Sequence, residues 1–333
     1  MTVRQVLLLP LLALVAAAAP PSYRMSAALP GPDGGWDYAA VDPAAHRLFV
    51  ARGSNITAFD LMGAMPPRSL GTIARAHAAV PVPNSALVLV TSGNDASVRL
   101  LDIGSGAETA RITVGEKPDA AILDAGTGHA FVANAKDGTV SDIDVRAAKA
   151  VRTFRLKPGL EFEAVGAGHI LFVNNEDANE IETVDLGSGA TGSAIPLPGC
   201  EGPSGLAYDR TSNVLISACA NGKAAIVDAS SRKLTRLVDI GSGPDAVLLD
   251  EMRRIALIPC GRDGVLEILA LDGPAGVRKI GSVKTEAGAR TGAIDPATGR
   301  VYLPTASFAP PATAGGRPVP APGSFHVLVL SPS

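Results

Sequence analysis

Apolar and polar positions follow the same pattern seven times along the chain, about every 40 residues. Each repeat begins with a strand of small and apolar residues that ends at one position, usually aspartate, which we call the anchor. A short turn and a second apolar strand follow, and a third strand ends in another aspartate. The anchors are Asp42, Val82, Asp124, Gly166, Asp209, Asp250 and Asp295, and the later aspartates are Asp60, Asp102, Asp144, Asp185, Asp228 and Asp272. Short strands at this period are typical of β-propellers, in which one repeat forms one four-stranded blade. The sequence therefore predicts an all-β fold, a seven-bladed β-propeller.

The last repeat lacks one strand. The blades fall near residues 35–77, 78–118, 119–159, 160–203, 204–244, 245–288 and 289–330, and the last supplies strands only at 291–295, 301–304 and 325–330. Residues 23–29 (YRMSAAL) precede the first blade. We expect this N-terminal segment to complete the last blade and close the ring, because it would pair an otherwise exposed edge. Its deletion is expected to cost more stability than trimming an ordinary terminus.

One connection is much longer than its counterparts. Residues 308–324 (FAPPATAGGRPVPAPGS) stand where the other blades have only a few residues. Proline and glycine at this density predict extended or mobile coil. The segment is either a surface insertion or a lid, since it joins a second strand to a third and emerges beside the channel mouth described below.

The first 19 residues have the pattern of a secretory signal peptide. Arg4 supplies a positive charge, residues 6–15 are apolar, and residues 16–19 are small. The apolar run is shorter than the roughly 20 residues of a membrane-spanning helix, although a retained anchor is the alternative reading. Residues 20–333 then form a single propeller domain, and we expect it in the periplasm or outside the cell, without membrane association after cleavage.

Composition narrows the classes of partner. Thirty-six glycines and 26 prolines suit a fold with many turns. The formal net charge is −3, and Lys and Arg form no cluster in the sequence. Nucleic-acid binding normally needs such a cluster to displace counterions from phosphates. We therefore expect a small-molecule ligand or a periplasmic protein as partner, no nucleic acid, and a monomeric chain.

Three cysteines suggest one disulfide. Cys200 falls in the loop that enters blade 5, and Cys219 falls at the far end of that blade's second strand. Both positions belong to the same face, so Cys200 with Cys219 is the expected pair, and Cys260 is expected to be a buried free thiol. Metal binding by the three together is disfavoured because no C-x-x-C spacing occurs.

A ring of polar residues is predicted at one mouth of the central channel. The first strand of each blade lines the channel of a propeller, and the residue five places before each anchor belongs to that mouth. These residues are Asp37, His77, Asp119, Glu161, Ser204, Asp245 and Arg290. We predict a ligand-binding site here, to which the aromatic residues Trp36 and Tyr38 beside Asp37 can contribute. The plainer alternative is a channel filled with ordered water.

Blades 3 and 4 contribute two neighbouring carboxylates to the ring, which a purely structural role explains poorly. Asp119 and Glu161 stand side by side in the ring, so that one must keep a proton or a cation must join them. Asn134 and Asn175 end the second strands of the same blades, and the four oxygen donors would suit a divalent cation such as Ca²⁺. Lys117 could instead neutralise the pair. His77 is a candidate general base, with a buried channel histidine as the alternative.

Other recurring residues have a simpler explanation. The anchor aspartates precede turns, where a short carboxylate accepts backbone N–H groups. His46, His129 and His169 occupy equivalent places before second strands and are assigned the same structural role. A serine hydrolase is disfavoured because no G-x-S-x-G motif occurs and Ser204 lies three blades from His77.

Several phrases resemble the YncE-like (YVTN-repeat) β-propeller proteins, an exported bacterial group. They are GCEGPSGLAYD at 199–209 with SACANG at 217–222, GARTGAIDPATGRVYLPTASF at 288–308 with GSFHVLVL at 323–330, and the entries KPDAAILD at 117–124 and GPDAVLLD at 243–250. The resemblance implies a seven-bladed propeller in the periplasm or outside the cell, and it supports the pairing of Cys200 with Cys219. It implies no fixed reaction.

The chain departs from that repeat in two places. Blade 2 reads AAVPVPNS at 78–85 and lacks the aspartate, and the YVTN phrase survives only at 302–305. We expect a YncE-like binding propeller that holds a small ligand or a protein partner over its polar mouth. The alternative is a divalent-metal-dependent hydrolase or lyase of the lactonase type, by analogy with other propellers.

Overall fold

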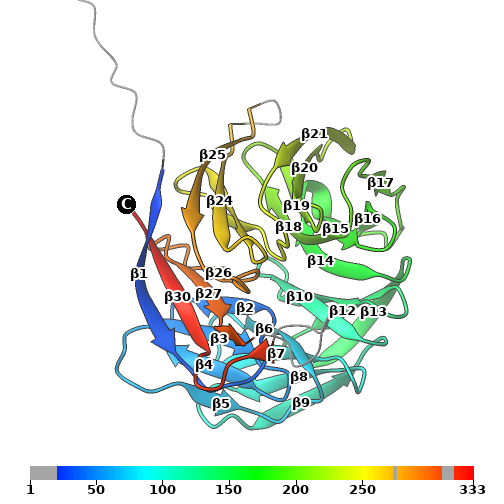
Figure 1. Cartoon of the computed structure of the whole chain (residues 1–333). Helices are drawn as coiled ribbons and strands as arrows, with labels where there is room; N and C mark the ends of the chain where they lie inside the picture. Colours follow the sequence, from blue (N-terminus) through cyan, green and yellow to red (C-terminus); the bar gives the residue numbers. More distant parts are fainter. Residues whose placement is uncertain (1–20, 273–275, 310–318) are drawn as a thin grey trace, which may run out of the picture.

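Seven four-stranded antiparallel sheets form a ring around a central channel (Figure 1). The computed structural model describes residues 21–272, 276–309 and 319–333. The predicted seven-bladed β-propeller is confirmed. The proposed signal peptide lies outside the described residues.

Blades 1 to 4 take up the first half of the chain. Blade 1 holds β2 (Ala39–Asp42), β3 (Arg47–Ala51), β4 (Ile56–Asp60) and β5 (Arg68–Leu70). Blade 2 holds β6 (Ala76–Pro81), β7 (Leu87–Ser92), β8 (Ser97–Asp102) and β9 (Glu108–Thr113). Blade 3 holds β10 (Pro118–Asp124), β11 (His129–Asn134), β12 (Thr139–Asp144) and β13 (Lys149–Arg155). Blade 4 holds β14 (Leu160–Val165), β15 (Ile170–Asn175), β16 (Glu180–Asp185) and β17 (Ile195–Pro196), with the 3₁₀ turn η1 (Ala167–His169) before β15.

Blades 5 to 7 complete the ring. Blade 5 holds β18 (Pro203–Asp209), β19 (Val214–Cys219), β20 (Lys223–Asp228) and β21 (Lys233–Asp239). Blade 6 holds β22 (Leu248–Asp250), β23 (Ile255–Cys260), β24 (Val265–Ala270) and β25 (Arg278–Lys284). Blade 7 consists of β26 (Ala293–Ile294), β27 (Val301–Thr305), β30 (His326–Pro332) and β1 (Tyr23–Pro30).

The N-terminal strand closes the ring as predicted. β1 pairs antiparallel with β30, from Tyr23 opposite Pro332 to Pro30 opposite His326. The hydroxyl of Tyr23 donates a hydrogen bond to Oδ2 of Asp250 in blade 6 at 2.8 Å. The first strand is therefore joined both to its own blade and to the neighbouring one.

The hydrophobic core lies between blades. Seven clusters of buried side chains occur in the described chain, and each draws mainly on two neighbouring blades, so that every blade-to-blade interface has one. Phe49 and Leu101 belong to the cluster between blades 1 and 2, and Phe172 and Leu215 to that between blades 4 and 5. Burial of apolar surface at about 25 cal/mol per Å² therefore stabilises the ring as a whole.

The anchor aspartates form turns, as predicted. Asp42 accepts the backbone N–H groups of Ala44 and Ala45, and the aspartates of blades 3, 5, 6 and 7 accept equivalent bonds. Blade 2 has Val82 at this position. There the hydroxyl of Ser85 donates to the Val82 carbonyl at 2.8 Å and accepts the N–H of Leu87 at 3.1 Å. The turn of blade 2 is therefore held without a carboxylate.

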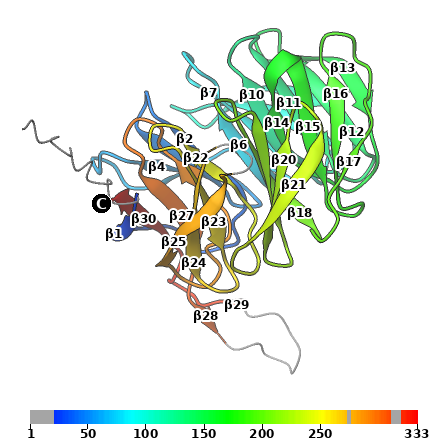
Figure 2. The same ribbon diagram turned by 90° about the horizontal axis from the view of Figure 1, so that it is seen from above.

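The disulfide and the long connection complete the fold. Cys200 and Cys219 are joined with their Cα atoms 5.4 Å apart, and Cys260 is a buried free thiol. This disulfide is compatible with an oxidising extracellular compartment. In the 308–324 connection, β28 (Phe308–Ala309) pairs with β29 (Val319–Pro320) in a short ribbon that projects from the ring (Figure 2). The sequence analysis predicted only coil here; residues 310–318 lie outside the described part.

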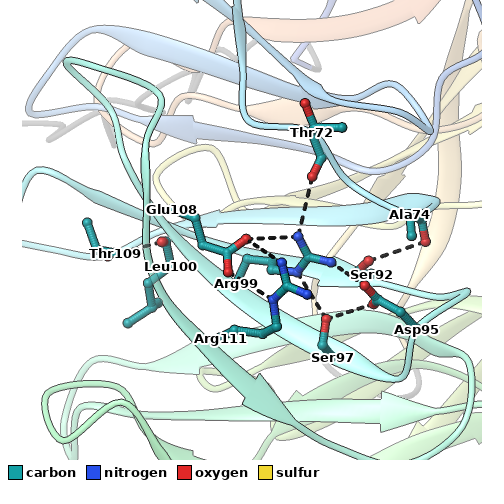
Figure 3. Close-up of polar contacts among 10 residues, drawn as sticks. All are labelled: Thr72, Ala74, Ser92, Asp95, Ser97, Arg99, Leu100, Glu108, Thr109 and Arg111. Carbon is teal, nitrogen blue, oxygen red and sulfur yellow. Dashed lines mark hydrogen bonds and ion pairs between the residues drawn. The ribbon is translucent and has the colours of Figure 1, made fainter.

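A buried arginine organises blade 2 (Figure 3). The side chain of Arg99 on β8 is 4% exposed; it pairs with Asp95 and with Glu108, whose Oε2 lies 2.9 Å from Nη1. Nη1 also donates to the carbonyl of Thr72, in the connection from blade 1. Arg111 shares Glu108 but is 56% exposed.

We predict that Arg99→Ala lowers the free energy of unfolding by about 3 kcal/mol, because it removes a buried cation from its partners together with the packing of its stem. Arg111→Ala, which removes an exposed cation from the same Glu108, should cost less than about 1 kcal/mol. Urea denaturation monitored by fluorescence measures both. Equal losses for the two variants would contradict a special role for the buried arginine.

We also predict that a chain beginning at Gly31 is much less stable than one beginning at Pro21. The shorter chain lacks β1, so the edge of β30 is left unpaired. It also lacks Tyr23, so the side chains of blade 6 that pack against this residue become exposed. We expect a drop in melting temperature of roughly 5 °C, on the order of 3 kcal/mol for a domain of this size, or aggregation. Calorimetry measures the melting temperature, and size-exclusion chromatography detects aggregation. Unchanged melting would show that closure by β1 is dispensable.

Candidate functional site

The predicted polar ring lies where the chain enters the first strand of each blade. His77, Asp119, Glu161 and Ser204 are on the innermost strands β6, β10, β14 and β18. Asp37, Asp245 and Arg290 lie in the segments just before β2, β22 and β26. Backbone hydrogen bonds between blades fix several of these positions: the N–H of Tyr38 donates to the carbonyl of His77, and the N–H of Asp245 to that of Arg290.

His77 joins two carboxylates from neighbouring blades. Its Nδ1 lies 2.8 Å from Oδ2 of Asp37 and 3.3 Å from Oδ1 of Asp119. Nε of Arg75 donates to Nε2 of the same ring at 3.1 Å. Nε2 is therefore the acceptor nitrogen, and Nδ1 carries the proton that faces the carboxylates. Gly93 makes room for the ring, because a Cβ there would lie 2.8 Å from Nε2.

These contacts bear on the proposed role of His77 as a base. The imidazole is 4% exposed, and both of its nitrogens are engaged. Its contacts therefore support a positioning role for His77, holding Asp37 and Asp119 together. The lactonase-type alternative gains no support from this geometry.

Glu161 is held by a tyrosine from the opposite side of the channel. The hydroxyl of Tyr38, in blade 1, donates to Oε2 of Glu161, in blade 4, at 3.0 Å. The Tyr38 ring meets Phe162 edge-on, with centroids 5.2 Å apart. Burial, reinforced by the nearby Asp119, raises the pKa of Glu161 to about 9. Glu161 therefore keeps its proton at neutral pH, which was one of the two outcomes expected for the Asp119–Glu161 pair.

The remaining acids of the ring differ in their partners. Nζ of Lys117 lies 3.3 Å from Oδ2 of Asp119. Burial raises the pKa of Asp119, and the neighbouring His77 opposes that rise. Nε of Arg290 donates to Oδ2 of Asp245 at 2.8 Å. Burial raises the pKa of Asp245 to about 6, with Arg290 opposing.

The backbone two residues before the ring positions is left-handed in six blades. Blades 4 to 7 have glycine there, at Gly159, Gly202, Gly243 and Gly288, whereas blades 2 and 3 have Arg75 (φ 71°) and Lys117 (φ 53°). A long side chain in this conformation costs on the order of 1 kcal/mol. Both of these side chains reach the ring, Arg75 to His77 and Lys117 to Asp119. The two strained backbone positions are therefore those whose side chains place a cation at the channel mouth.

A hollow of about 650 Å³ opens over blades 4 to 7 of this mouth. Its polar lining includes Glu176, Ser204, Asp245, Arg262 and Arg290. The size is that of a typical small-molecule pocket. The hydroxyl of Ser204 is turned to the carbonyl of Pro244 at 3.1 Å.

The aromatic residue that lines the hollow is Phe308, whereas the sequence analysis expected Trp36 and Tyr38. Phe308, at the start of the long connection, lines the hollow. Trp36 packs behind it, with ring centroids 6.1 Å from Phe308 and 5.6 Å from Phe325. The sequence analysis placed the connection on this face but missed Phe308, Glu176 and Arg262 as site residues. Glu176 was signalled by its place directly after β15, at the end that faces the mouth.

The two asparagines of the predicted metal set differ in the state of their carbonyl oxygens. Nδ2 of Asn134 donates to Thr139 and Ser141, both at 3.0 Å, whereas its buried Oδ1 has no hydrogen-bond partner among the described residues. Oδ1 of Asn175 accepts the N–H of Ala178, and its Nδ2 donates to Pro158 and Glu182. These contacts place Asn175 in the local turn, and calcium binding with Asp119 and Glu161 stays an untested prediction.

A different group has metal-like spacing. Ligand atoms of Asp37, His77 and Asp119 lie within 4.8 Å of one another. However, the hydrogen bond from Arg75 leaves the proton on Nδ1, the nitrogen that faces both carboxylates. That nitrogen has no free lone pair for an ion, so the group is satisfied as a hydrogen-bonded network.

Comparisons with known proteins support the fold. Hydrazine synthase of Kuenenia stuttgartiensis matches 87% of this chain and 95% of its own with a TM-score of 0.68 at 15% identity. A chain of a mitotic checkpoint complex matches 99% of both chains with a TM-score of 0.75 at 13% identity. No family model and no curated protein sequence matches the chain. In residues 21–272, 276–309 and 319–333, no helix is long and apolar enough to cross a membrane.

We predict that Glu161→Gln stabilises the protein increasingly as the pH rises. Between the ordinary pKa of about 4.5 and the folded value of about 9, the unfolded chain releases a proton that folded Glu161 retains, so this group costs the native protein stability as the pH rises through that window. Glutamine abolishes the cost while still accepting from Tyr38. Melting temperatures at about pH 5 and about pH 9 measure it.

The control for this prediction is Glu251→Gln, on the exposed turn of blade 6. It makes the same substitution far from the mouth and should leave the pH dependence of melting as in the unaltered protein. A Glu161→Gln advantage that is equal at both pH values would show that Glu161 is not the titrating group.

Proposed function

We propose that the protein is an exported, YncE-like binding propeller that captures a small molecule bearing a positively charged amine at its polar channel mouth. The main support for this proposal is that two neighbouring glutamates, Glu161 and Glu176, lack a basic partner among the residues that the structure describes. In the described chain neither forms an ion pair, whereas Asp37, Asp119 and Asp245 each have a basic partner. Burial, with Asp177 nearby, also raises the pKa of Glu176.

The chemistry of the hollow favours a cation. Glu176 lines the hollow and lies beside Glu161. An ammonium group bound at Glu176, next to Glu161, would stabilise the charged forms of both, which burial otherwise disfavours. Phe308 offers an aromatic face, which attracts cations. Arg290 and Arg262 on another part of the lining can donate hydrogen bonds to a carboxylate of the same molecule. Export is supported by the Cys200–Cys219 disulfide.

We predict that putrescine and agmatine bind, and that succinate binds at least tenfold more weakly, about 1.4 kcal/mol. Because Glu161 must lose its proton when the cation arrives, affinity should rise between about pH 6 and about pH 8, and binding should release protons. Isothermal titration calorimetry in buffers of different ionisation enthalpy measures both effects.

Glu161→Gln and Glu176→Gln should each weaken amine binding, and Glu251→Gln should not. Glu161→Gln should also abolish the pH dependence. Should no amine bind, or should both variants bind as the unaltered protein does, the small-cation proposal fails, and a protein partner at the mouth becomes the function to test.

A further inference from the structure

The channel contains a second compartment below the polar mouth. It has a volume of about 240 Å³ and is lined by residues of four blades. They are Tyr38, Ala39, Ala40, Val41, Phe162, Ala246, Val247, Leu248, Gly292, Ala293 and Ile294. Apart from the tyrosine hydroxyl, all of these side chains are apolar, in contrast to the carboxylates directly above.

Tyr38 and Phe162 form the roof of this compartment. The hydroxyl of Tyr38 donates to Glu161, and the nearby charges that raise its pKa, after burial itself, are Glu161, Asp245, Asp119 and Asp37. The polar atom of Tyr38 therefore faces the mouth, and its ring faces the compartment. The ring of Phe162 meets that of Tyr38 edge-on and lines the compartment beside it.

The compartment continues toward the opposite face of the ring. A second hollow, of about 880 Å³, shares Ala40 and Val41 with it and extends over the turn residues of blades 1 and 2. Its lining includes Val80, Pro81, Pro83 and Leu123, together with the polar residues Asp42, Asn84 and Ser85. A third hollow, of about 580 Å³, shares Pro83 and Leu123 and adds Val82 and Leu100.

Blade 2 departs from the repeat near this approach. At the anchor position, where five other blades carry an aspartate, it has Val82 in the sequence VPVPNS. Ser85 replaces the missing carboxylate in the turn. The departure from the repeat therefore leaves the turn intact and removes a charge from the rim of the opposite mouth.

We propose that the axial compartment is a binding site for a small uncharged aromatic or branched aliphatic molecule, which enters from the face opposite the polar mouth. Apolar cavities of about 150 Å³ are known to exclude water and to take up benzene or xenon. The larger compartment here suits a molecule of one or two rings. The edges of the innermost strands supply backbone groups that can orient a single polar atom of it. The site does not depend on the amine site above the roof.

The test uses the uncharged two-ring fluorescent probe 1-naphthylamine with the full-length mature protein. We expect saturable fluorescence enhancement. Ala40→Leu, at the junction of the compartment and its entrance, should weaken probe binding by about tenfold or more. Ala147→Leu makes the same change on an exposed turn of the same face and should have no effect. Glu176→Gln, at the polar hollow and away from the roof, should also leave probe binding unchanged, which separates this site from the polar mouth.

Crystals of the unaltered protein under xenon pressure provide a test that is independent of any variant. Xenon is expected between Val41, Phe162 and Val247. Absence of xenon from the compartment, or equal probe binding by the Ala40→Leu variant with an unchanged melting temperature, would overturn the proposal.

Discussion

Closure of the ring is the constraint on which the whole structure depends. Every hydrophobic cluster of the described residues lies mainly between two blades, so the blades bury their apolar faces against one another. The pairing of β1 with β30 supplies the last strand of blade 7, and with it the interfaces on both sides. Because a closed ring cannot loosen at one interface without straining the others, residues hundreds of positions apart are held at fixed places around one axis.

Polar links between blades set the geometry of the mouth. The hydroxyl of Thr91 donates to the carbonyl of Asp119, and Nδ2 of Asn174 donates to that of Ser204. These bonds attach one blade's second strand to the next blade's first strand. The acids of the ring are therefore presented from rigid strands, where burial can raise the pKa of Glu161 and Asp245. Asp245 is offset by Arg290, whereas Glu161 has no basic partner among the described residues, so its ionisation would destabilise the protein.

Sequence repetition predicted what is common to the blades. The seven sheets, the closing strand, the turn aspartates and the ring around the mouth all follow from equivalent positions. The repeat could not predict contacts that depend on where a side chain points, either within its own loop or across the channel to another blade. Asn175 fits the repeat as a ligand but turns into its own loop, and Tyr38 reaches Glu161 on the far side of the channel. Phe308 belongs to the one connection that has no counterpart in other blades.

Departures from the repeat mark the places where this ring differs from a uniform one. Arg75 and Lys117 occupy backbone positions that are glycine in blades 4 to 7, and both bring charge to the mouth. Val82 replaces an aspartate and removes charge from the opposite end. These substitutions act in opposite senses at the two ends of one channel. Tyr38 separates the two ends, with its hydroxyl among the acids and its ring above the apolar compartment. A single residue therefore allows one channel to present two chemically different surfaces.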